Sequence, residues 1–552
     1  MSSPVAGRSP ATAVLVAGAG PVGLVLACEL LRRGVPVRVV DASAAPGSAP
    51  QSRAVLLWPR TLELLRGIEA AEPLTAAGHQ LGAIGYRSDG RLLGTVRMGR
   101  IDDTPYPYAV TLPQYETERI LLQRLAAYGG DVERGTAIEA VIAAPDGQSV
   151  SVLLRHPGGE AEQVTADWLV GADGAHSTVR KEMGIAFTGD NVDVTFGIAD
   201  VGIQGQVARD TLHYCYTRDG ALGVVPLPGD LFRVAVSIPH RDPTDPPSAG
   251  VFRQALQRHA PGFGELGEPR WTGSFRVRCR IAESFRQGRV LLAGDAAHVI
   301  SPAGGQGMNL GIQDAVNLGW KLAGVARGNL ADGLLDSYHT ERRAAAQRVA
   351  SATAAQTRWG LVRGRLRIIV RDTLVRLASA SGALQKVVAP LMAQTDVRYD
   401  GLTPLAPHHG ARGARLTGMR LPVFPGPTAP SGAGPANPFE PVLAASTFTV
   451  LDWLGASVGT SLARQSPEAM AALADRAVVT PVNSTASPAL GRSLYQALGR
   501  AMCRDGALIT VRPDGHVAFL AANTPAGARA TTAFLDSQVT TRARTAAAEH
   551  AP

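Results

Sequence analysis

The pattern of apolar positions predicts a strand–helix–strand unit near the N-terminus. Residues 13–17 form a short continuous apolar run, typical of a buried strand, and residues 22–33 carry apolar side chains at helical spacing. Residues 36–40 predict a second strand, and this order of elements favours a parallel sheet. No charged residue lies between Arg8 and Glu29, as in a signal peptide, but the glycines of this stretch favour a strand and a tight turn.

A different pattern occupies the middle of the chain. From about 192 to 280, short strands such as 211–217 and 231–238 follow one another and predict a largely antiparallel sheet. After residue 289 a strand leads into helices that extend to about 395. The arginine-rich stretch 358–376 predicts a helix with a solvated basic face, with a nucleic-acid or lipid surface as the alternative. The other elements predicted before residue 289 are a helix at 115–128 and strands at 150–155 and 164–170. The first helix after residue 300 has an apolar stripe of Met308, Ile312, Ala315, Gly319 and Leu322.

The C-terminal part is separated from the rest by a proline-rich segment. Residues 421–441 contain seven prolines among glycine and serine, the composition of a linker or long surface loop. Pro513, Asp514 and Gly515 predict a tight turn between two strands. The elements predicted here are strand 447–452, helix 467–475, strand 477–482, helix 492–500, strands 507–512 and 516–520, and a helix from about 525.

Composition narrows the class of protein. A chain of 552 residues allows two to four domains at about 150 residues each. With 45% hydrophobic and 18% charged residues it is globular, and a net charge of +8 without a concentrated basic patch argues against nucleic-acid binding. The four cysteines, Cys28, Cys215, Cys279 and Cys503, form no CxxC pair, so neither a metal knuckle nor a disulfide framework is predicted. This cysteine usage fits a reducing cytoplasm, and no membrane span is expected.

The first chemical motif is Gly18-x-Gly20-x-x-Gly23, between the first predicted strand and helix. Gly18 permits a tight turn, Gly20 lets the backbone approach a pyrophosphate, and Gly23 lets the helix pack on the strand. The helix N-terminus then offers free N–H groups to the phosphates. Asp41 ends the second strand, where its carboxylate can accept hydrogen bonds from ribose hydroxyls. This motif predicts dinucleotide binding but does not separate FAD from NAD.

Two further motifs follow predicted strands. Leu169 to Gly174 (LVGADG) is a strand that runs into a turn, with Ser177 placed to cap the next helix. In the stretch 289–309, a strand delivers Asp295 to a point where it can bind the hydroxyls of a ribityl chain. The glycines after Pro302 let backbone N–H groups approach a flat ring, and the helix dipole near Met308 favours negative charge there. His298 is interpreted as a loop histidine with a satisfied partner rather than as a proton carrier.

Together these motifs closely resemble the single-component flavin-dependent aromatic hydroxylases typified by p-hydroxybenzoate hydroxylase. The resemblance is strongest to bacterial aromatic-polyketide hydroxylases, such as those of angucycline and anthracycline pathways, and their Baeyer–Villiger relatives. It runs over most of residues 12–350 and returns at 509–519 (ITVRPDGHVAF). It also implies that Arg53 and Gln114 contact FAD. The residues expected at the cofactor are Gly18, Gly20, Pro21, Val22, Gly23, Asp41, Arg53, Gln114, Asp173, Gly174, Gly294, Asp295, Pro302, Gly305, Gly307, Met308 and Asn309.

The resemblance also implies a mixed α/β fold of several domains. It has a Rossmann-like FAD-binding domain with an inserted antiparallel sheet that binds the substrate, and a thioredoxin-like C-terminal domain that here lacks CxxC. The expected divisions are residues 10–80, 106–191 and 281–350 for the FAD domain, 81–105 and 192–280 for the substrate domain, 351–400 for a helical extension, 401–441 for the linker and 442–545 for the thioredoxin-like domain.

The implied activity is a monooxygenase reaction on a polycyclic aromatic substrate. NADPH or NADH reduces FAD as a transient reductant, O2 forms a flavin C4a-hydroperoxide, and one oxygen passes to the ring. No protein acid or base is assigned, and no metal is expected. Phe196, Tyr214, Tyr216 and Phe232, with segment 80–110, are candidate walls for a planar substrate, although each aromatic also fits plain core. Baeyer–Villiger oxidation of a ketone and a non-catalytic flavin-binding subunit are the alternatives; a monomer or homodimer is expected.

Overall fold

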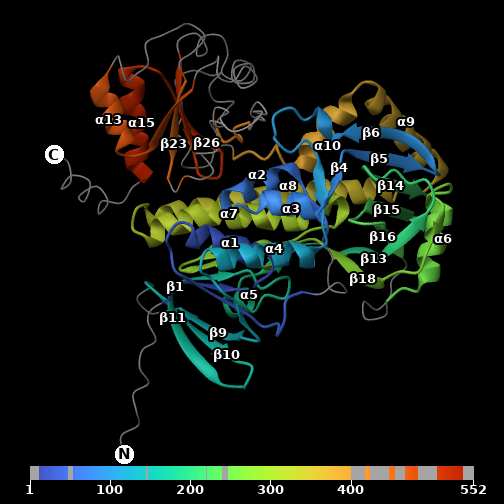
Figure 1. Ribbon diagram of the computed structural model, residues 1–552, viewed down its shortest axis with the longest axis horizontal. Helices are drawn as coiled ribbons and strands as arrows, with labels where there is room; N and C mark the ends of the chain where they lie inside the picture. The colour runs from blue at the N-terminus through green and yellow to red at the C-terminus, as the bar shows by residue number, and fades with distance from the viewer. Residues whose placement is uncertain are drawn as a thin grey trace, which may run out of the picture.

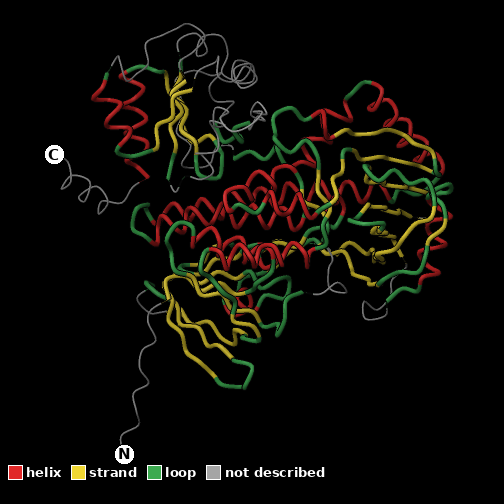
Figure 2. Tube along the Cα trace, in the orientation of Figure 1, coloured by secondary structure: helices red, strands yellow, loops and turns green. Residues whose placement is uncertain are grey.

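The computed structural model describes residues 12–47, 54–143, 147–189, 191–218, 220–238, 246–399, 417–422, 445, 447–453, 466–482 and 506–538. Two large sheets, a layer of helices between and beside them, and a smaller C-terminal sheet make up the molecule (Figures 1 and 2). Within these residues no helix is both long enough and apolar enough to cross a membrane.

The first sheet contains the predicted N-terminal strands. β1 (Thr12–Ala17) pairs in parallel with β2 (Val37–Asp41) on one side and with β11 (Ala161–Gly171) on the other, and β11 pairs in parallel with β21 (Val290–Leu292). β9 (Ala137–Ala143) and β10 (Val150–Arg155) extend β11 as an antiparallel hairpin. The central path, in spatial order, is β20 (Arg286–Gln287), β21 (Val290–Leu292), β11 (Ala161–Gly171), β1 (Thr12–Ala17), β2 (Val37–Asp41) and β8 (Glu133–Arg134).

The first helix beside this sheet is apolar and almost entirely buried. α1 (Pro21–Leu31) begins with proline at its first position, where the missing N–H costs nothing, and it buries Leu24, Leu26 and Leu30 completely. It packs between α4 (Gln114–Ala127) and α7 (Gly307–Ala326). The remaining helices of this layer are α2 (Pro59–Leu65), α3 (Ala71–Ala77), α5 (Thr178–Glu182) and α8 (Asp336–Gly360).

The second sheet confirms the antiparallel pattern predicted for 192–280. Its strands alternate in direction except that β14 (Thr211–Thr217) runs parallel to β5 (Ala83–Ser88), from the earlier segment of the chain. α6 (Ala249–His259) covers one face, with Phe252 and Leu256 in its core. In spatial order the strands are β17 (Glu265–Leu266), β13 (Asn191–Gln204), β16 (Leu231–Ile238), β15 (Gly220–Pro226), β14 (Thr211–Thr217), β5 (Ala83–Ser88) and β6 (Arg91–Arg97), with β18 (Trp271–Arg278) beside β13.

Two small sheets connect these parts. One joins the segment before α2 to the segment before α4, and the other brings the strand after η4 (Gly294–Ala296) next to the end of the second sheet. The strands are β3 (Leu56–Leu57), β7 (Ala109–Thr111) and β4 (His79–Leu81) in the first, and β12 (Phe187–Thr188), β19 (Arg280–Ala282) and β22 (His298–Val299) in the second.

The arginine-rich stretch 358–376 is not one helix. α8 ends at Gly360, and α9 (Arg365–Ala380) begins after Gly364, whose φ of +95° is a conformation that glycine adopts readily. α10 (Ala383–Ala393) follows. Arg365, Arg367 and Arg376 are exposed, as the predicted solvated basic face requires, but α9 also exposes large apolar side chains between its arginines.

The C-terminal sheet has the order β24 (Val478–Val482), β23 (Thr449–Trp453), β25 (Ala507–Val511) and β26 (Val517–Ala522), with α13 (Pro467–Ala474) and α15 (Pro525–Gln538) packed together. The helix predicted at 492–500 lies outside the described residues. Phe448, Leu508 and Phe534 form a core with Trp320 of α7, so this unit is joined to the first domain by apolar contact.

The predicted linker 401–441 is described only at 417–422, and these residues are attached to the rest of the fold. Met419 bridges to Arg398 and Arg420 bridges to His516 through backbone hydrogen bonds. The Arg420 side chain is buried and pairs with Glu63 and Asp103. The proline-rich composition of the neighbouring residues did not indicate these ion pairs. The average composition of a segment does not show which of its side chains pairs with a buried group.

Candidate functional site

The first glycine motif forms a close-packed turn between β1 and α1. Gly18 has a φ of +101°, and a side-chain carbon added there would lie 2.3 Å from the carbonyl oxygen of Ala172. A side-chain carbon on Gly23 would lie 1.9 Å from the carbonyl oxygen of Gly18. At Gly20 the added carbon meets no protein atom within 4 Å. Two glycines are therefore required by the chain itself, whereas Gly20 faces open space at the helix N-terminus.

Asp41 lies next to this turn. Its carboxylate accepts a 2.6 Å hydrogen bond from the Ala19 N–H and a 2.8 Å hydrogen bond from the Ser43 N–H, and Arg134 approaches to 3.7 Å. A cavity of about 200 Å³ begins here and is lined by Gly20, Asp41 and Arg134, among others. The cavity combines a helix N-terminus, an acid and a cation.

Gln114 lines the same cavity from the start of α4. Its amide nitrogen donates to Glu118 over 2.9 Å, and its amide oxygen accepts from the Ala54 N–H over 3.4 Å. Burial raises the pKa of Glu118, which the hydrogen bond from Gln114 partly offsets. Sequence reasoning missed Glu118 and Arg134, because neither belongs to a motif. Arg53, which was predicted to contact FAD, lies outside the described residues.

The second motif places Asp173 directly beside the first. One Asp173 oxygen accepts hydrogen bonds from the N–H groups of Thr178 and Val179, at 2.7 and 3.2 Å, while the other is buried without a partner. Ser177 caps α5 by accepting from the Arg180 N–H at 2.9 Å, as predicted. A buried carboxylate oxygen without a partner is costly unless a ligand or water donates to it. Gly174 follows in a left-handed conformation with open space around it.

The third motif meets the first at Val22. A side-chain carbon on Gly294 would lie 2.8 Å from Val22, and one on Gly311 of α7 would lie 2.7 Å from the same residue. Asp295, in the 3-10 turn η4, is exposed although both neighbouring residues are buried. The fold therefore brings the three sequence motifs to one edge of the first sheet.

His298 has the satisfied partner that the sequence suggested. Its Nε2 atom lies 2.5 Å from Asp314, and Arg342 donates to the other Asp314 oxygen at 2.6 Å. Burial alone would raise the pKa of Asp314, but His298 and Arg342 outweigh it, so the pKa is lowered. The Gly294 N–H also donates to Asp314. Asp314 is thus a buried anchor of the loop that carries Asp295.

The glycine loop before α7 is held by Asn309. Its amide accepts from the Trp58 N–H at 2.8 Å and donates to the carbonyl groups of Leu56 and Gly305 at 2.8 and 2.9 Å. The Trp58 indole also donates to the Gly304 carbonyl at 2.9 Å. The side chain of Asn309 therefore fixes the loop and is occupied by backbone partners. The other residues predicted at the cofactor here belong to the same loop. Pro302 is exposed, and the half-buried ones are Gly305, Gly307 and Met308.

A row of tyrosines lies beside this loop. Tyr86 stacks on Tyr214 with ring centres 5.6 Å apart, and Tyr214 stacks on Tyr216 at 6.3 Å. Burial raises the pKa of Tyr214 to about 12, although the Gln356 side chain and a hydrogen bond with the Gly304 backbone act in the opposite direction. Tyr86 belongs to the segment 80–110 that was expected to form a wall, although the residue itself was not singled out. Gln356 was missed, since only the packing of α8 brings it here.

The other two aromatic candidates lie apart from the row. The strand register puts Phe196 on the same face as Tyr214 but three strands away, stacked on Phe275. Phe232 is buried on the opposite face in the core against α6, so its prediction as a substrate wall is wrong. Alternation along a strand fixes which residues share a face, but only tertiary packing decides which face meets the site.

The residues present fit a dinucleotide with an attached flat ring. The open Gly20, the partner-free Asp173 oxygen, the exposed Asp295 and the cavity at Asp41 lie along one edge of the sheet, from the α1 N-terminus toward the glycine loop. Helix N-termini and backbone N–H groups suit phosphates, and carboxylates suit sugar hydroxyls. Within the described part of the chain, no group of three or more His, Cys, Asp or Glu side chains forms a metal site.

Comparison with known proteins agrees with this geometry. The FAD binding domain family model matches residues 11–353. The 6-methylpretetramide 4-monooxygenase of Streptomyces rimosus is 40% identical over 403 residues, covering 72% of this chain and 70% of that protein. The anhydrotetracycline hydroxylase OxyS from Streptomyces rimosus superposes with a TM-score of 0.72 at 31% identity, over 95% of this chain and 98% of that one. CabE, an aromatic hydroxylase from angucycline biosynthesis, gives 0.72 at 29% identity, over 96% and 100%. The chain belongs to the FAD-binding domain family, and it is a FAD-dependent monooxygenase.

Proposed function

We propose that this chain hydroxylates an electron-rich ring of a polycyclic, polyketide-type aromatic molecule, with NADPH or NADH as electron donor. The observation that carries the proposal is the tyrosine row Tyr86–Tyr214–Tyr216, which reaches the Gly304 backbone of the glycine loop. Stacked aromatic side chains offer a flat apolar surface with polar tips, which suits a planar phenolic molecule. The names of the relatives, a pretetramide monooxygenase and an anhydrotetracycline hydroxylase, support the same class of substrate.

The geometry supports an assignment of the residues that would hold FAD. Gly20 and the α1 N-terminus would receive the pyrophosphate, Asp41 the adenosine ribose, and Asp295 the ribityl chain. The loop Pro302–Met308 would lie against the flavin ring. When bound, FAD supplies the electron transfer and the activation of O2.

The chain's own residues orient the substrate and keep water away. Tyr214 and Tyr216 present their rings, and the Gln356 side chain lowers the pKa of both hydroxyls against the larger effect of burial. Burial raises the pKa of each of these tyrosines, so both stay protonated and can donate to a phenolic or carbonyl oxygen of a ligand at neutral pH. No described residue is assigned as a general base, and the enzyme's contribution is position and a dry environment.

The C-terminal unit supports a thioredoxin-like fold. β23 is parallel to β24 and antiparallel to β25, and β26 closes the edge. The chain carries no CxxC pair, so its role here is packing rather than thiol chemistry. A cytoplasmic enzyme, monomeric or dimeric, is consistent with the scattered cysteines.

The reaction type is tested by its product. Purified holoenzyme is supplied with NADPH, 18O2 and a panel of polycyclic phenols and ketones, and products are examined by mass spectrometry. One labelled ring hydroxyl supports the proposal, whereas a labelled lactone supports Baeyer–Villiger oxidation instead. Phenols that bind without accelerating NADPH oxidation would favour a non-catalytic flavin-binding subunit.

A further inference from the structure

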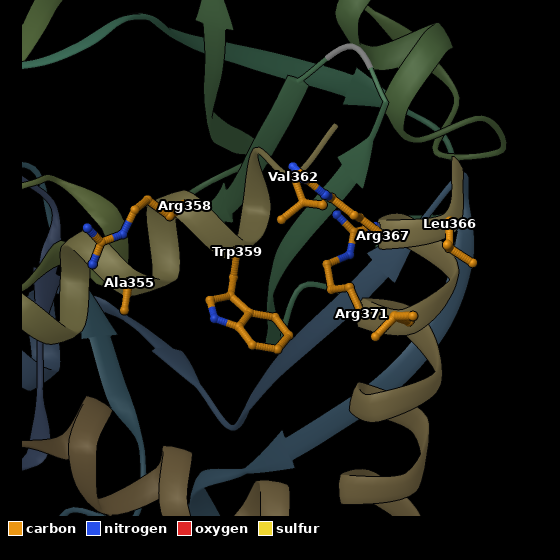
Figure 3. Close-up of a pocket in the computed structure, with 8 residues that line it drawn as sticks. Ala355, Arg358, Trp359, Val362, Leu366, Arg367 and Arg371 are labelled. Atoms are coloured by element: carbon orange, nitrogen blue, oxygen red, sulfur yellow. The ribbon is translucent and has the colours of Figure 1, made fainter. Parts of the chain in front are cut away.

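A second cavity lies between α8 and α9, away from the glycine motifs. It has a volume of about 460 Å³, within the range of about 300–1,000 Å³ that is common for small-molecule sites. Figure 3 shows that Trp359 enters it from α8, while Arg367 and Arg371 extend from α9 toward Val362 in the connection between the helices. None of the three sequence motifs contributes to its lining.

The walls of this cavity are large apolar side chains that remain exposed. Trp359 is 50% exposed, Leu366 74% and Val370 50%. Of the six tryptophans in the chain, Trp359 is the exposed one; four are buried and Trp271 is half-buried. Apolar side chains gathered around one hollow mark a binding surface more often than scattered ones do. A flat aromatic molecule against Trp359 would cover these side chains.

The charge of the cavity is positive. Arg358 and Arg367 both line it, and neither has an acidic partner among the residues that the structure describes. The carboxylate at this place is Asp372, and it is held by Arg371 over 2.8 Å. An arginine that has no carboxylate to pair with is suited to bind an anionic oxygen with two N–H groups.

Arg371 connects this cavity to the tyrosine row. Its side chain is buried, donates to Ser88 at 2.8 Å, and lies 5.4 Å from the Tyr216 ring centre. Gly360 packs directly on the Tyr216 ring, since an added side-chain carbon would lie 2.5 Å from it. The cavity thus borders Tyr216 through Arg371 and Gly360, at one end of the tyrosine row.

We propose that the α8–α9 cavity is a second binding site, specific for a planar aromatic molecule that carries a carboxylate or an ionised phenol. Trp359 stacks on the ring system, and Arg367 pairs with the anionic oxygen. The inference rests on the proposed function only in the choice of an aromatic ligand.

The test uses two ligands of the same shape, anthraquinone-2-carboxylate and the neutral anthraquinone-2-carboxamide, titrated into the holoenzyme by calorimetry. Arg367→Gln should weaken binding of the carboxylate roughly tenfold and leave the carboxamide unchanged. Trp359→Ala should weaken both ligands several-fold. Arg376→Gln, on an exposed arginine of the same helix that does not line the cavity, should change neither. Flavin content and thermal midpoint of each variant are measured alongside.

Equal affinities in the wild type and Arg367→Gln, or equal weakening of both ligands, would overturn the proposal. Binding to anionic phosphatidylglycerol vesicles that Arg367→Gln abolishes, without binding of the carboxylate, would assign this surface to a membrane instead. The outcome is independent of turnover: if phenols fail to stimulate NADPH oxidation but Arg367→Gln still separates the two ligands, the proposed function fails and the second site stands.

Discussion

At the scale of single residues, the glycines of the first motif are required for different reasons. Gly18 and Gly23 are enclosed by the chain's own carbonyl groups, at 2.3 and 1.9 Å from an added carbon. Gly20 has a φ of −75°, which any residue adopts, and nothing within 4 Å. The protein itself therefore gives no reason for glycine at position 20, and the reason must be the approach of a ligand.

Gly20→Ala should leave the apoprotein folded, with a loss of stability of no more than about 0.5 kcal/mol. Its FAD affinity should fall at least roughly tenfold, because the methyl group enters the space of the pyrophosphate. Fluorescence titration of apoprotein with FAD measures this. Gly23→Ala is the matched control and should fail to fold. Unchanged FAD affinity in Gly20→Ala would show that the pyrophosphate lies elsewhere.

At the scale of elements, α7 buries more of its surface than the apolar stripe in its sequence predicts. The predicted stripe of Ile312, Ala315 and Leu322 is buried, but the polar side chains between them are buried too. Lys321 donates to Glu341 of α8 at 2.9 Å, and Arg512 binds the same carboxylate through both oxygens. A sequence window cannot reveal this, because the partners lie 20 and more residues away along the chain and only the fold covers the polar face.

Lys321→Met should raise stability at neutral pH by about 1 kcal/mol. Burial lowers the pKa of Lys321 to about 8 from its ordinary 10.5, despite the opposing pull of Glu341. Because the folded-state pKa lies below the unfolded one, the charged amine costs stability below pH 8. That cost disappears as the pH rises from about 8 to 10.5.

The gain from Lys321→Met should therefore be largest at pH 7 and shrink toward pH 10, as urea midpoints of both proteins across this range would show. Glu341 keeps Arg512 and the Asn317 amide as partners in the variant. A variant that is strongly destabilised at pH 7 would mean that the Lys321–Glu341 pair outweighs the cost of burial.

At the scale of the whole molecule, the turn between β25 and β26 ties the C-terminal unit into the FAD domain. Asp514 accepts from Arg512 at 2.5 Å, from Asn317 at 3.2 Å and from the Trp320 indole at 3.3 Å, and its carbonyl accepts from Arg60 at 2.6 Å. Burial alone would raise the pKa of Asp514, but Arg512 and His516 outweigh it and lower the pKa well below its ordinary value.

Asp514→Asn should destabilise the whole enzyme by about 3 kcal/mol, since buried Arg512 loses one of its two carboxylate partners and keeps only Glu341. The thermal midpoint of unfolding and the temperature at which FAD is released should fall together, because the turn packs on α7, which begins at the glycine loop. Asp536→Asn removes a half-exposed pair with Arg476 in the same unit and should cost less than about 1 kcal/mol. If the two substitutions cost the same stability, the C-terminal unit unfolds independently and the turn does not hold it to the FAD domain.

The sequence alone determined the family, the cofactor and the order of elements, because glycines at fixed spacing and strands that end in aspartate carry their chemistry locally. Strand boundaries at 211–217 and 231–238 were predicted to the residue. Only the tertiary structure decided that Phe232 faces α6, that Tyr86 joins Tyr214, that Arg420 is an anchor and that α9 breaks from α8 to leave a cavity. Those outcomes depend on which faces meet and which distant charges find each other, and packing sets both.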